Sequence, residues 1–272
     1  MAMHRFFLTA QLPRASVGSP LLPAEEPVAL PLTAADVHHA RDVARLGVDE
    51  QIAVVEPDRS AWVVRITALG DVIEALPIGE LPAPAEPHVT LVQGLAKGDK
   101  LDLIVEKTIE LGIEAVVPVA FERSIVRLDD DRAAKRGERL RRVAAAAAKQ
   151  AQRTYVPAIS DPQPTSTLLR VLADFDVVLV AWEDADGAPG IRQALSSAGA
   201  TVDSRVAIVV GPEGGLSEPE VAALTGAGAH IVSLGQFVLR TETAGIVAAA
   251  LTIYELGGLG GSGAATPGAS DA

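Results

Sequence analysis

Cysteine is absent from the chain, and its absence excludes several kinds of site. Without thiols the protein cannot form disulfides, thiolate zinc sites or iron–sulfur clusters, and it cannot use a cysteine nucleophile. Long apolar runs are also absent: no stretch approaches the roughly 18 apolar residues of a membrane span, and residues 1–10 lack the apolar core of a signal peptide. These absences fit a reducing compartment, so we expect the protein in the cytoplasm.

Basic residues are outnumbered by acidic ones, 23 to 35, which gives a net charge of −12. This balance argues at first against a nucleic-acid partner, because phosphate binding needs a basic surface. Residues 132–153 depart from it: eight basic residues face a single acid, Glu138, and eight minus one leaves about +7. This basic row consists of Arg132, Lys135, Arg136, Arg139, Arg141, Arg142, Lys149 and Arg153. It is typical of a solvated helix face or of a phosphate-binding track, and the sequence leaves both open.

The 272 residues suffice for two domains of modest size, and the first of them is rich in β-favouring runs. Such runs occur at residues 52–55, 61–66 and 72–76, with turn chemistry between the first two. They predict a small β domain over residues 1–76. Within it, Thr33 is placed to cap a helix over residues 34–46 that Gly47 would end.

Prolines at positions 77, 82, 84 and 87 separate this region from the rest of the chain. Proline cannot pair within a central strand, so residues 77–87 are predicted to be an interdomain linker. The chain after residue 257 turns to glycine, serine, alanine and proline, and we expect residues 257–272 to form a disordered tail.

Between linker and tail, residues 88–256 alternate between strand and helix patterns. This alternation predicts an α/β domain with a mainly parallel sheet covered by helices on both faces. The expected strands are residues 89–92, 115–119, 177–182, 206–210 and 231–234, and the expected helices are residues 101–111, 133–152 and 241–256.

Two segments of this domain, residues 209–216 and 234–244, each run from a buried strand through a loop into a helix. Open α/β sheets bind small molecules at such strand ends, so we interpret the pair as one cofactor pocket. The glycines of Gly211-Pro212-Glu213-Gly214-Gly215 expose bare backbone amides, and Ser217 with Glu220 predicts a capping box at the next helix. The loops contain neither GxxxxGK[ST] nor GxGxxG, which disfavours phosphate-anhydride chemistry. An ordinary glycine turn remains the alternative.

Arg240 and Glu242 stand out because they begin an otherwise apolar helix. The arginine is suited to hold a phosphate or carboxylate, and the glutamate to accept hydrogen bonds or neutralise a cation. The alternative is an internal ion pair that fixes the start of the helix.

Gly-Pro-Glu-Gly-Gly-Leu at 211–216, with Leu234-Gly235 and Leu239-Arg240-Thr241-Glu242-Thr243-Ala244, resembles a known family. This is the 16S ribosomal RNA uridine-N3 methyltransferase family, RsmE, of the SPOUT superfamily. The resemblance covers most of residues 89–256. It extends to Lys107, Glu110-Leu111-Gly112, Pro118, Glu122-Arg123-Ser124 and the segment 150–153 before Val156-Pro157.

The resemblance implies a homodimer that binds S-adenosylmethionine in a C-terminal trefoil knot, preceded by a PUA-like β-barrel domain. It implies methylation of N3 of a uridine in small-subunit ribosomal RNA, within an assembled subunit, with S-adenosylhomocysteine as product and without a metal or a membrane. Periodicity and spacing would not have indicated a knot. The cofactor-binding residues that the resemblance implies are Val210, Gly211, Pro212, Glu213, Gly214, Leu234, Gly235, Val238, Leu239, Arg240 and Thr241.

Methyl transfer to N3 of uridine requires the N3 proton to leave, which suggests roles for three residues. A cation, Arg240 or Arg123, would stabilise the imide anion of the base, and Glu242 is the nearest candidate proton acceptor. With ribosomal RNA as substrate the basic row becomes a phosphate track, formed by Arg132, Lys135, Arg136, Arg139, Arg142, Lys149 and Arg153. Lys149 stands where many members of the family have glutamate, which is a departure from the pattern of the family.

Two other functions remain open. One is a related SPOUT enzyme with a different acceptor, such as a ribose 2′-hydroxyl. The other is a catalytically silent RNA-binding factor of ribosome assembly that keeps the fold.

Overall fold

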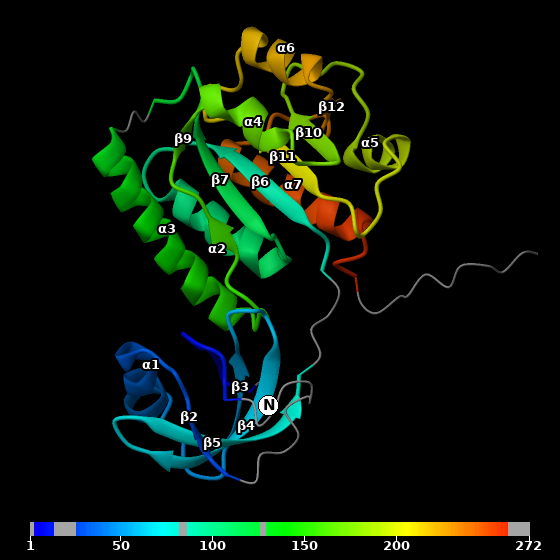
Figure 1. Cartoon of the computed structure of the whole chain (residues 1–272). Helices are drawn as coiled ribbons and strands as arrows, with labels where there is room; N and C mark the ends of the chain where they lie inside the picture. Colours follow the sequence, from blue (N-terminus) through cyan, green and yellow to red (C-terminus); the bar gives the residue numbers. More distant parts are fainter. Residues whose placement is uncertain (1–2, 14–25, 82–85, 126–128, 261–272) are drawn as a thin grey trace, which may run out of the picture. The chain divides into compact units, whose positions relative to one another are not determined.

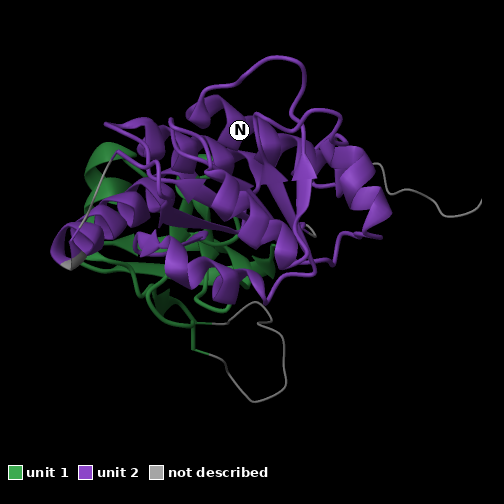
Figure 2. Ribbon diagram, turned by 90° about the horizontal axis from the view of Figure 1, so that it is seen from above, with its two compact units in different colours: residues 1–84, 148–156 green, residues 85–147, 157–272 purple. Residues whose placement is uncertain are grey.

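The computed structural model describes residues 3–13, 26–81, 86–125 and 129–260. The chain divides into two compact units, one of residues 1–84 and 148–156 and the other of residues 85–147 and 157–272 (Figure 2). We call them the N-terminal unit and the C-terminal unit. Most of the expected disordered tail, residues 261–272, lies outside the described residues.

The N-terminal unit is built on a five-stranded sheet (Figure 1). The order is β1 (Arg5–Phe7), β3 (Gln51–Val55), β4 (Ala61–Leu69), β5 (Ile73–Glu80) and β2 (Val28–Ala29). β1 pairs in parallel with β3, and the other described pairs are antiparallel. The alternate residues Ile52, Val54, Val64 and Ile66 are fully buried, which gives the unit a core of its own. The unit is thus rich in β structure, and the domain bounds of 1–76, closure into a barrel and RNA binding by this unit stay predictions.

Strand β5 runs further than the sequence indicated. It continues through Pro77 to Glu80, so the first four residues of the expected linker belong to the sheet. Pro77 pairs with Val64 at an irregularity of the β4–β5 ladder, and β2 pairs with β5 only at Glu74 and Ala75. Proline is tolerated there because a bulge or an open strand edge demands no N–H donor.

The expected helix over residues 34–46 begins as predicted and ends early. The Thr33 hydroxyl accepts from the Asp36 amide at 3.2 Å, which caps α1 (Ala34–His38). A π-helical turn, η1 (His39–Val43), follows it. The chain leaves the helix before Gly47 because Arg45 takes a left-handed conformation with φ of 53°.

The C-terminal unit contains a seven-stranded sheet, and every described strand pair in it is parallel. The expected α/β architecture is therefore confirmed. The order is β12 (His230–Val232), β10 (Val177–Ala181), β11 (Val206–Val210), β6 (Val89–Gly94), β7 (Ala115–Ala120) and β8 (Ala158–Ile159), with β9 (Gln163–Pro164) also on β7.

Helices cover both faces of this sheet, because its central strands are apolar on both sides. α4 (Leu168–Leu172), preceded by the 3₁₀ turn η2 (Thr165–Thr167), and α6 (Glu218–Gly226) pack on one face, around Val92, Val180 and Val209. α2 (Lys100–Leu111), α5 (Ile191–Ser197) and α7 (Thr241–Glu255) pack on the other, and α7 lies against both α2 and β6. The long basic helix, α3 (Asp130–Gln150), starts three residues earlier and ends two residues earlier than expected.

The connections diverge between β6 and β11. From β6 the chain crosses through α2 to β7, whereas from β11 it crosses through α6 to β12, in the opposite direction along the sheet. In open parallel sheets the crevice outside the carboxyl ends at such a switch point is the usual ligand site. The carboxyl ends of β6, β11, β10 and β12 lie side by side there.

Candidate functional site

A cavity of about 690 Å³ lies at the carboxyl ends of β10, β11 and β12. Three loops form its wall: residues 182–188 after β10, the glycine loop at 211–215 after β11, and the 233–240 loop that leads into α7. Lys100, the first residue of α2, contributes from a fourth segment. The cavity is therefore assembled from segments far apart in the sequence, which is how α/β sheets build ligand sites.

Glycine is required at two places around this cavity. Gly215 has φ of 71°, and a Cβ there would overlap the Glu183 carboxylate. A Cβ on Gly94, at the end of β6, would overlap the backbone of Gly211 and Pro212. The glycine loop thus passes bare backbone against β6 and against the loop after β10. The predicted capping box at Ser217 and Glu220 is present, and it fixes the start of α6 directly after the glycines.

The expected cofactor-binding residues fall around the cavity with one difference. All of them except Gly214 line it, namely Val210, Gly211, Pro212, Glu213, Leu234, Gly235, Val238, Leu239, Arg240 and Thr241. Gly214 turns away and packs on Arg123, whose Nη1 donates to the Gly214 carbonyl at 3.3 Å. Two loops that the sequence paired as one pocket do share one cavity, and their contact with a cofactor stays a prediction.

The three expected catalytic residues take different positions. Arg240 is the exposed N-cap residue of α7 and lines the cavity. Arg123 supports the glycine loop from outside the cavity wall. Glu242 lies behind the wall, with Oε2 at 3.3 Å from Lys100 Nζ. The alternative of an Arg240–Glu242 ion pair is therefore replaced by a Lys100–Glu242 pair among the described residues.

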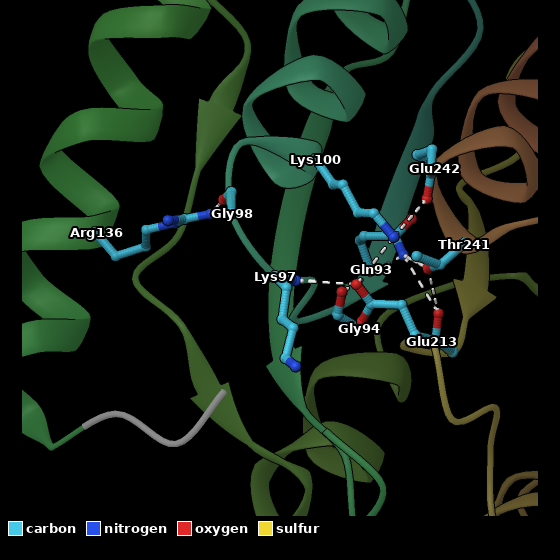
Figure 3. A network of polar contacts seen from close by, with 10 residues as sticks. Gln93, Gly94, Lys97, Gly98, Lys100, Arg136, Glu213, Thr241 and Glu242 are labelled. Carbon is cyan, nitrogen blue, oxygen red and sulfur yellow. Dashed lines mark hydrogen bonds and ion pairs between the residues drawn. The ribbon is translucent and has the colours of Figure 1, made fainter. Parts of the chain in front are cut away.

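Lys100 joins two carboxylates at the cavity wall, as Figure 3 shows. Its Nζ lies 3.2 Å from Glu213 Oε1 and 3.3 Å from Glu242 Oε2, and the Lys97 amide donates to Glu213 Oε1 at 3.0 Å. Burial opposes ionisation of Glu213, but the Lys97 amide and the Lys100 ammonium hold the pKa of this carboxyl below its usual value. Hydrogen bonding to Glu213, supported by Glu242, raises the pKa of Lys100. Glu213 is therefore ionised and Lys100 protonated near neutral pH.

A second, buried contact links the same two segments. Gln93 Nε2 donates to Thr241 Oγ1 at 2.9 Å, and Thr241 Oγ1 donates to the Gly211 carbonyl at 2.6 Å (Figure 3). Gln93 is fully buried on β6. The glycine loop and the first residue of α7 are thus joined in one hydrogen-bonded network with Gln93 of β6.

Sequence reasoning missed several cavity residues. Trp182, Glu183 and Asp186 follow β10, and the rule that sites lie at strand ends could have found them. Lys100 gave no such signal, because it begins a helix that starts far away in the sequence. The indole N–H of Trp182 is buried and has no hydrogen-bond partner among the described residues.

The basic row on α3 is partly neutralised within the C-terminal unit. Arg139 pairs with Asp99 and Asp102, at 2.7 Å and 2.6 Å, and Arg141 pairs with Asp161 at 2.8 Å. Arg136 donates to the Gly98 carbonyl at 2.9 Å, and Arg132 lies 3.6 Å from Asp129. Lys135 and Arg142 are exposed and form no ion pair with another described residue.

The last two members of the row belong to the N-terminal unit. Lys149 forms an ion pair with Asp36, and Arg153, with 5% of its surface exposed, lies over the Tyr155 ring at 4.9 Å. Both therefore contribute to packing, and the exposed cations of the row lie on the part of α3 that belongs to the other unit.

The part of the chain that the structure describes lacks two further features. None of the helices there is both long and apolar enough to cross a bilayer. No three side chains of histidine, cysteine, aspartate or glutamate gather there as a metal site would require.

Comparison with known proteins adds three findings. Residues 84–253 match the RNA methyltransferase domain family. The chain is 35% identical over 240 residues to ribosomal RNA small subunit methyltransferase E of Bacillus subtilis, which covers 85% of this chain and 92% of that protein. The protein of the same name from Aquifex aeolicus is 29% identical over 212 residues, covering 77% and 87%.

One solved structure is similar over nearly the whole chain. It is a ribosomal RNA small subunit methyltransferase E from Neisseria gonorrhoeae bound to S-adenosyl methionine, with a TM-score of 0.75 and 30% identity, and the match covers 92% of this chain and 96% of that one.

Proposed function

Because this chain belongs to the RNA methyltransferase family, and within it to the ribosomal RNA small subunit methyltransferase E group, we propose that it methylates N3 of a uridine in small-subunit ribosomal RNA. The methyl donor is S-adenosylmethionine, and the product is S-adenosylhomocysteine. The observation that carries this proposal is the single cavity formed by the glycine loop and the 233–240 loop, with Arg240 on its wall. We further propose that the enzyme works in the cytoplasm.

The residues around the cavity fit a nucleoside cofactor. Gly211 and Gly215 let the glycine loop fold tightly against itself and against Glu183 at the cavity wall, and the buried Trp182 N–H is a donor in need of an acceptor. Acidic and basic side chains both reach the wall, as a cofactor with an amino-acid head requires. S-adenosylmethionine, when bound, supplies an activated methyl group on a sulfonium.

The chain's own residues position the reacting atoms. Transfer forms the bond from the methyl carbon to N3, breaks its bond to sulfur and releases the N3 proton, so the acceptor must lie in line with the sulfur. Arg240, exposed on the wall, is placed to stabilise the imide anion that remains when the proton leaves. Arg123 acts by holding the glycine loop at Gly214. Glu242 is retained as the candidate proton acceptor, although Lys100 lies between it and the cavity.

RNA binding is proposed for the exposed cations of α3. Lys135 and Arg142 carry this role, since neither is neutralised by a described acid. Three further arginines contribute to RNA binding where a phosphate displaces their present partners. They are Arg132, paired with Asp129, Arg136, bound to the Gly98 carbonyl, and Arg139, paired with Asp99 and Asp102. Lys149 and Arg153 are engaged in the N-terminal unit, and we leave them out of the proposed track. An assembled subunit is the proposed form of the substrate.

The homodimer, the trefoil knot and the PUA-like domain are proposed from the same membership. Exposed apolar side chains on two helices that pack together, Leu103 of α2 with Leu251 and Tyr254 of α7, support the dimer. After the edge strand β12 the chain returns as α7, which packs against β6 and α2, and this return supports the knot. Sedimentation analysis tests the dimer, and a crystal structure tests the knot.

The direct test is mass spectrometry of nucleosides from small-subunit ribosomal RNA. Assembled subunits that lack the modification are incubated with the purified protein and S-adenosylmethionine, and 3-methyluridine is expected. A 2′-O-methylated nucleoside would instead overturn the choice of acceptor atom. Cofactor binding without any methylation would favour a silent RNA-binding factor.

A further inference from the structure

The cluster of Lys100, Glu213 and Glu242 presents one cation and one anion to the same cavity. Lys100 and Glu213 both line the cavity, and their charged atoms lie 3.2 Å apart. Glu242 lies behind them. A ligand entering this corner therefore meets an ammonium and a carboxylate side by side.

Both charged groups keep hydrogen-bonding capacity for a ligand. An ammonium has three donors, of which Lys100 uses one in its hydrogen bond to Glu213, while Glu242 Oε2 lies 3.3 Å away as an ion-pair partner. Glu213 Oε1 accepts from the Lys97 amide and from Lys100, and the carboxylate also accepts from the backbone amide of Glu213 itself. A carboxylate offers about four lone-pair sites, so Glu213 can accept a further hydrogen bond.

The cluster is also held in place. The Lys97 amide fixes Glu213 from the turn before α2, and Lys100 is fixed between acids from two different loops. Below them, the Gln93–Thr241–Gly211 contacts hold the same two loops through buried groups. A pair of charges held in this way meets a ligand without reorganising, which strengthens its hydrogen bonds to that ligand.

An α-amino-acid group is the complement of such a pair, because it carries an ammonium and a carboxylate on one carbon. We propose that Lys100 and Glu213 bind the amino-acid head of S-adenosylmethionine: Lys100 donates to its carboxylate, and Glu213 accepts from its ammonium. The inference rests on the proposed function, and it assigns to Lys100 and Glu213 the end of the cofactor away from the adenine. Arg240 remains free for the RNA substrate.

The test compares two ligands that differ only at this end. S-adenosylhomocysteine carries the amino-acid head, whereas 5′-methylthioadenosine has the same adenosine and sulfur without it. Calorimetry gives both dissociation constants for the wild-type protein and for Lys100→Met. We expect the wild-type protein to bind S-adenosylhomocysteine at least about tenfold more tightly than methylthioadenosine, and Lys100→Met to reduce this ratio about tenfold, because a charge-assisted hydrogen bond is lost.

Lys97→Met is the matched control. It makes the same substitution three residues earlier, the side chain points away from the cluster in Figure 3, and its backbone amide still donates to Glu213. The ratio should stay at the wild-type value. Lys100→Arg, which keeps the cation, should restore part of the ratio.

Several outcomes would overturn the inference. An unchanged ratio in Lys100→Met would place the carboxylate elsewhere, and a ratio that falls instead in Arg240→Met would place it on Arg240. If Lys100→Met does not fold, as judged by thermal unfolding, Glu213→Gln tests the same subsite and should weaken only S-adenosylhomocysteine. A wild-type protein that binds neither ligand would overturn the proposed function itself.

Discussion

The cavity and helix α3 both gather charged side chains, but the two regions use them differently. At the cavity, Lys100 and Arg240 are placed on a wall that a ligand can reach. On α3, Arg139 and Arg141 are bound to acids of the same unit, and Lys149 is bound to Asp36. The number of charges in a segment therefore does not give the number available to a partner. The segment of α3 has the larger net charge, whereas the fewer charged side chains at the cavity are the ones that a ligand can contact.

The largest effect should come from Arg240. We expect Arg240→Ala to lower the single-turnover rate of RNA methylation by about 10²- to 10³-fold, because one cation would no longer stabilise the charge that develops on the base. The rate is measured at saturating cofactor and RNA.

Arg170→Ala is the matched control for Arg240, since Arg170 is an exposed arginine on α4 outside the cavity. It should leave the rate unchanged, and unfolding curves should show both variants folded. A near-normal rate in Arg240→Ala would contradict the proposed role and remove the contrast between the cavity and α3.

The next effect concerns the cations of α3 that have no acidic partner. The double variant Lys135→Ala/Arg142→Ala should weaken binding to small-subunit RNA and lower the slope of log affinity against log salt by about 1.4 to 1.8, the contribution of two phosphate contacts. Filter binding at several salt concentrations measures the slope.

A variant of the paired cations sharpens this result. Arg139→Ala/Arg141→Ala removes the same number of charges, yet its slope should change less, because Asp99, Asp102 and Asp161 already neutralise those residues. Equal slopes in the two double variants would show that internal pairing does not decide which cations bind RNA.

A smaller effect is expected on stability from Arg139 alone. Its ion pairs are exposed to solvent and screened, so Arg139→Ala should lower the free energy of unfolding only slightly. Urea unfolding measures the change. A large loss of stability would mean that the ion pairs between α3 and the start of α2 contribute to the fold.

The smallest effect should appear only as a dependence on pH. Burial opposes ionisation of Asp36, but Lys149 and Thr33 outweigh it and lower the pKa of Asp36 from its ordinary 3.8. A lowered pKa contributes stability above the ordinary value that is lost as the pH falls through the native value. Asp36→Asn should therefore be less stable than wild type at neutral pH, and the difference should shrink below about pH 4.

Lys149→Gln should reproduce this pattern while leaving RNA affinity unchanged. Asp71→Asn, at a fully exposed acid, should change neither the dependence of stability on pH nor the RNA affinity. A clear loss of RNA affinity in Lys149→Gln would return Lys149 to the track.

The same contrast explains what the sequence could and could not predict. Strand patterns such as residues 89–92 and 206–210, and the glycines after Val210, follow from local rules of burial and turn chemistry, and they correctly predicted the parallel sheet and the shared cavity. Lys100 and the partners of Arg139 depend on which segments the fold brings together, so no local pattern indicated them. The rule that proline ends a strand failed at Pro77, because the β4–β5 ladder is irregular there and needs no N–H donor from this residue.

The Thr241 hydroxyl accepts from Gln93 and donates to the Gly211 carbonyl. These two hydrogen bonds couple the first turn of α7 to the glycine loop. Fraying of the first turn of α7 alone is costly, since it would leave the buried Gln93 amide with only its longer contacts to the Gly94 and Gly211 carbonyls, at 3.5 Å and 3.4 Å. The two segments should then open in one event, and their amide hydrogens should exchange with deuterium at the same opening rate. A ligand bound between them would slow the exchange of both by one common factor.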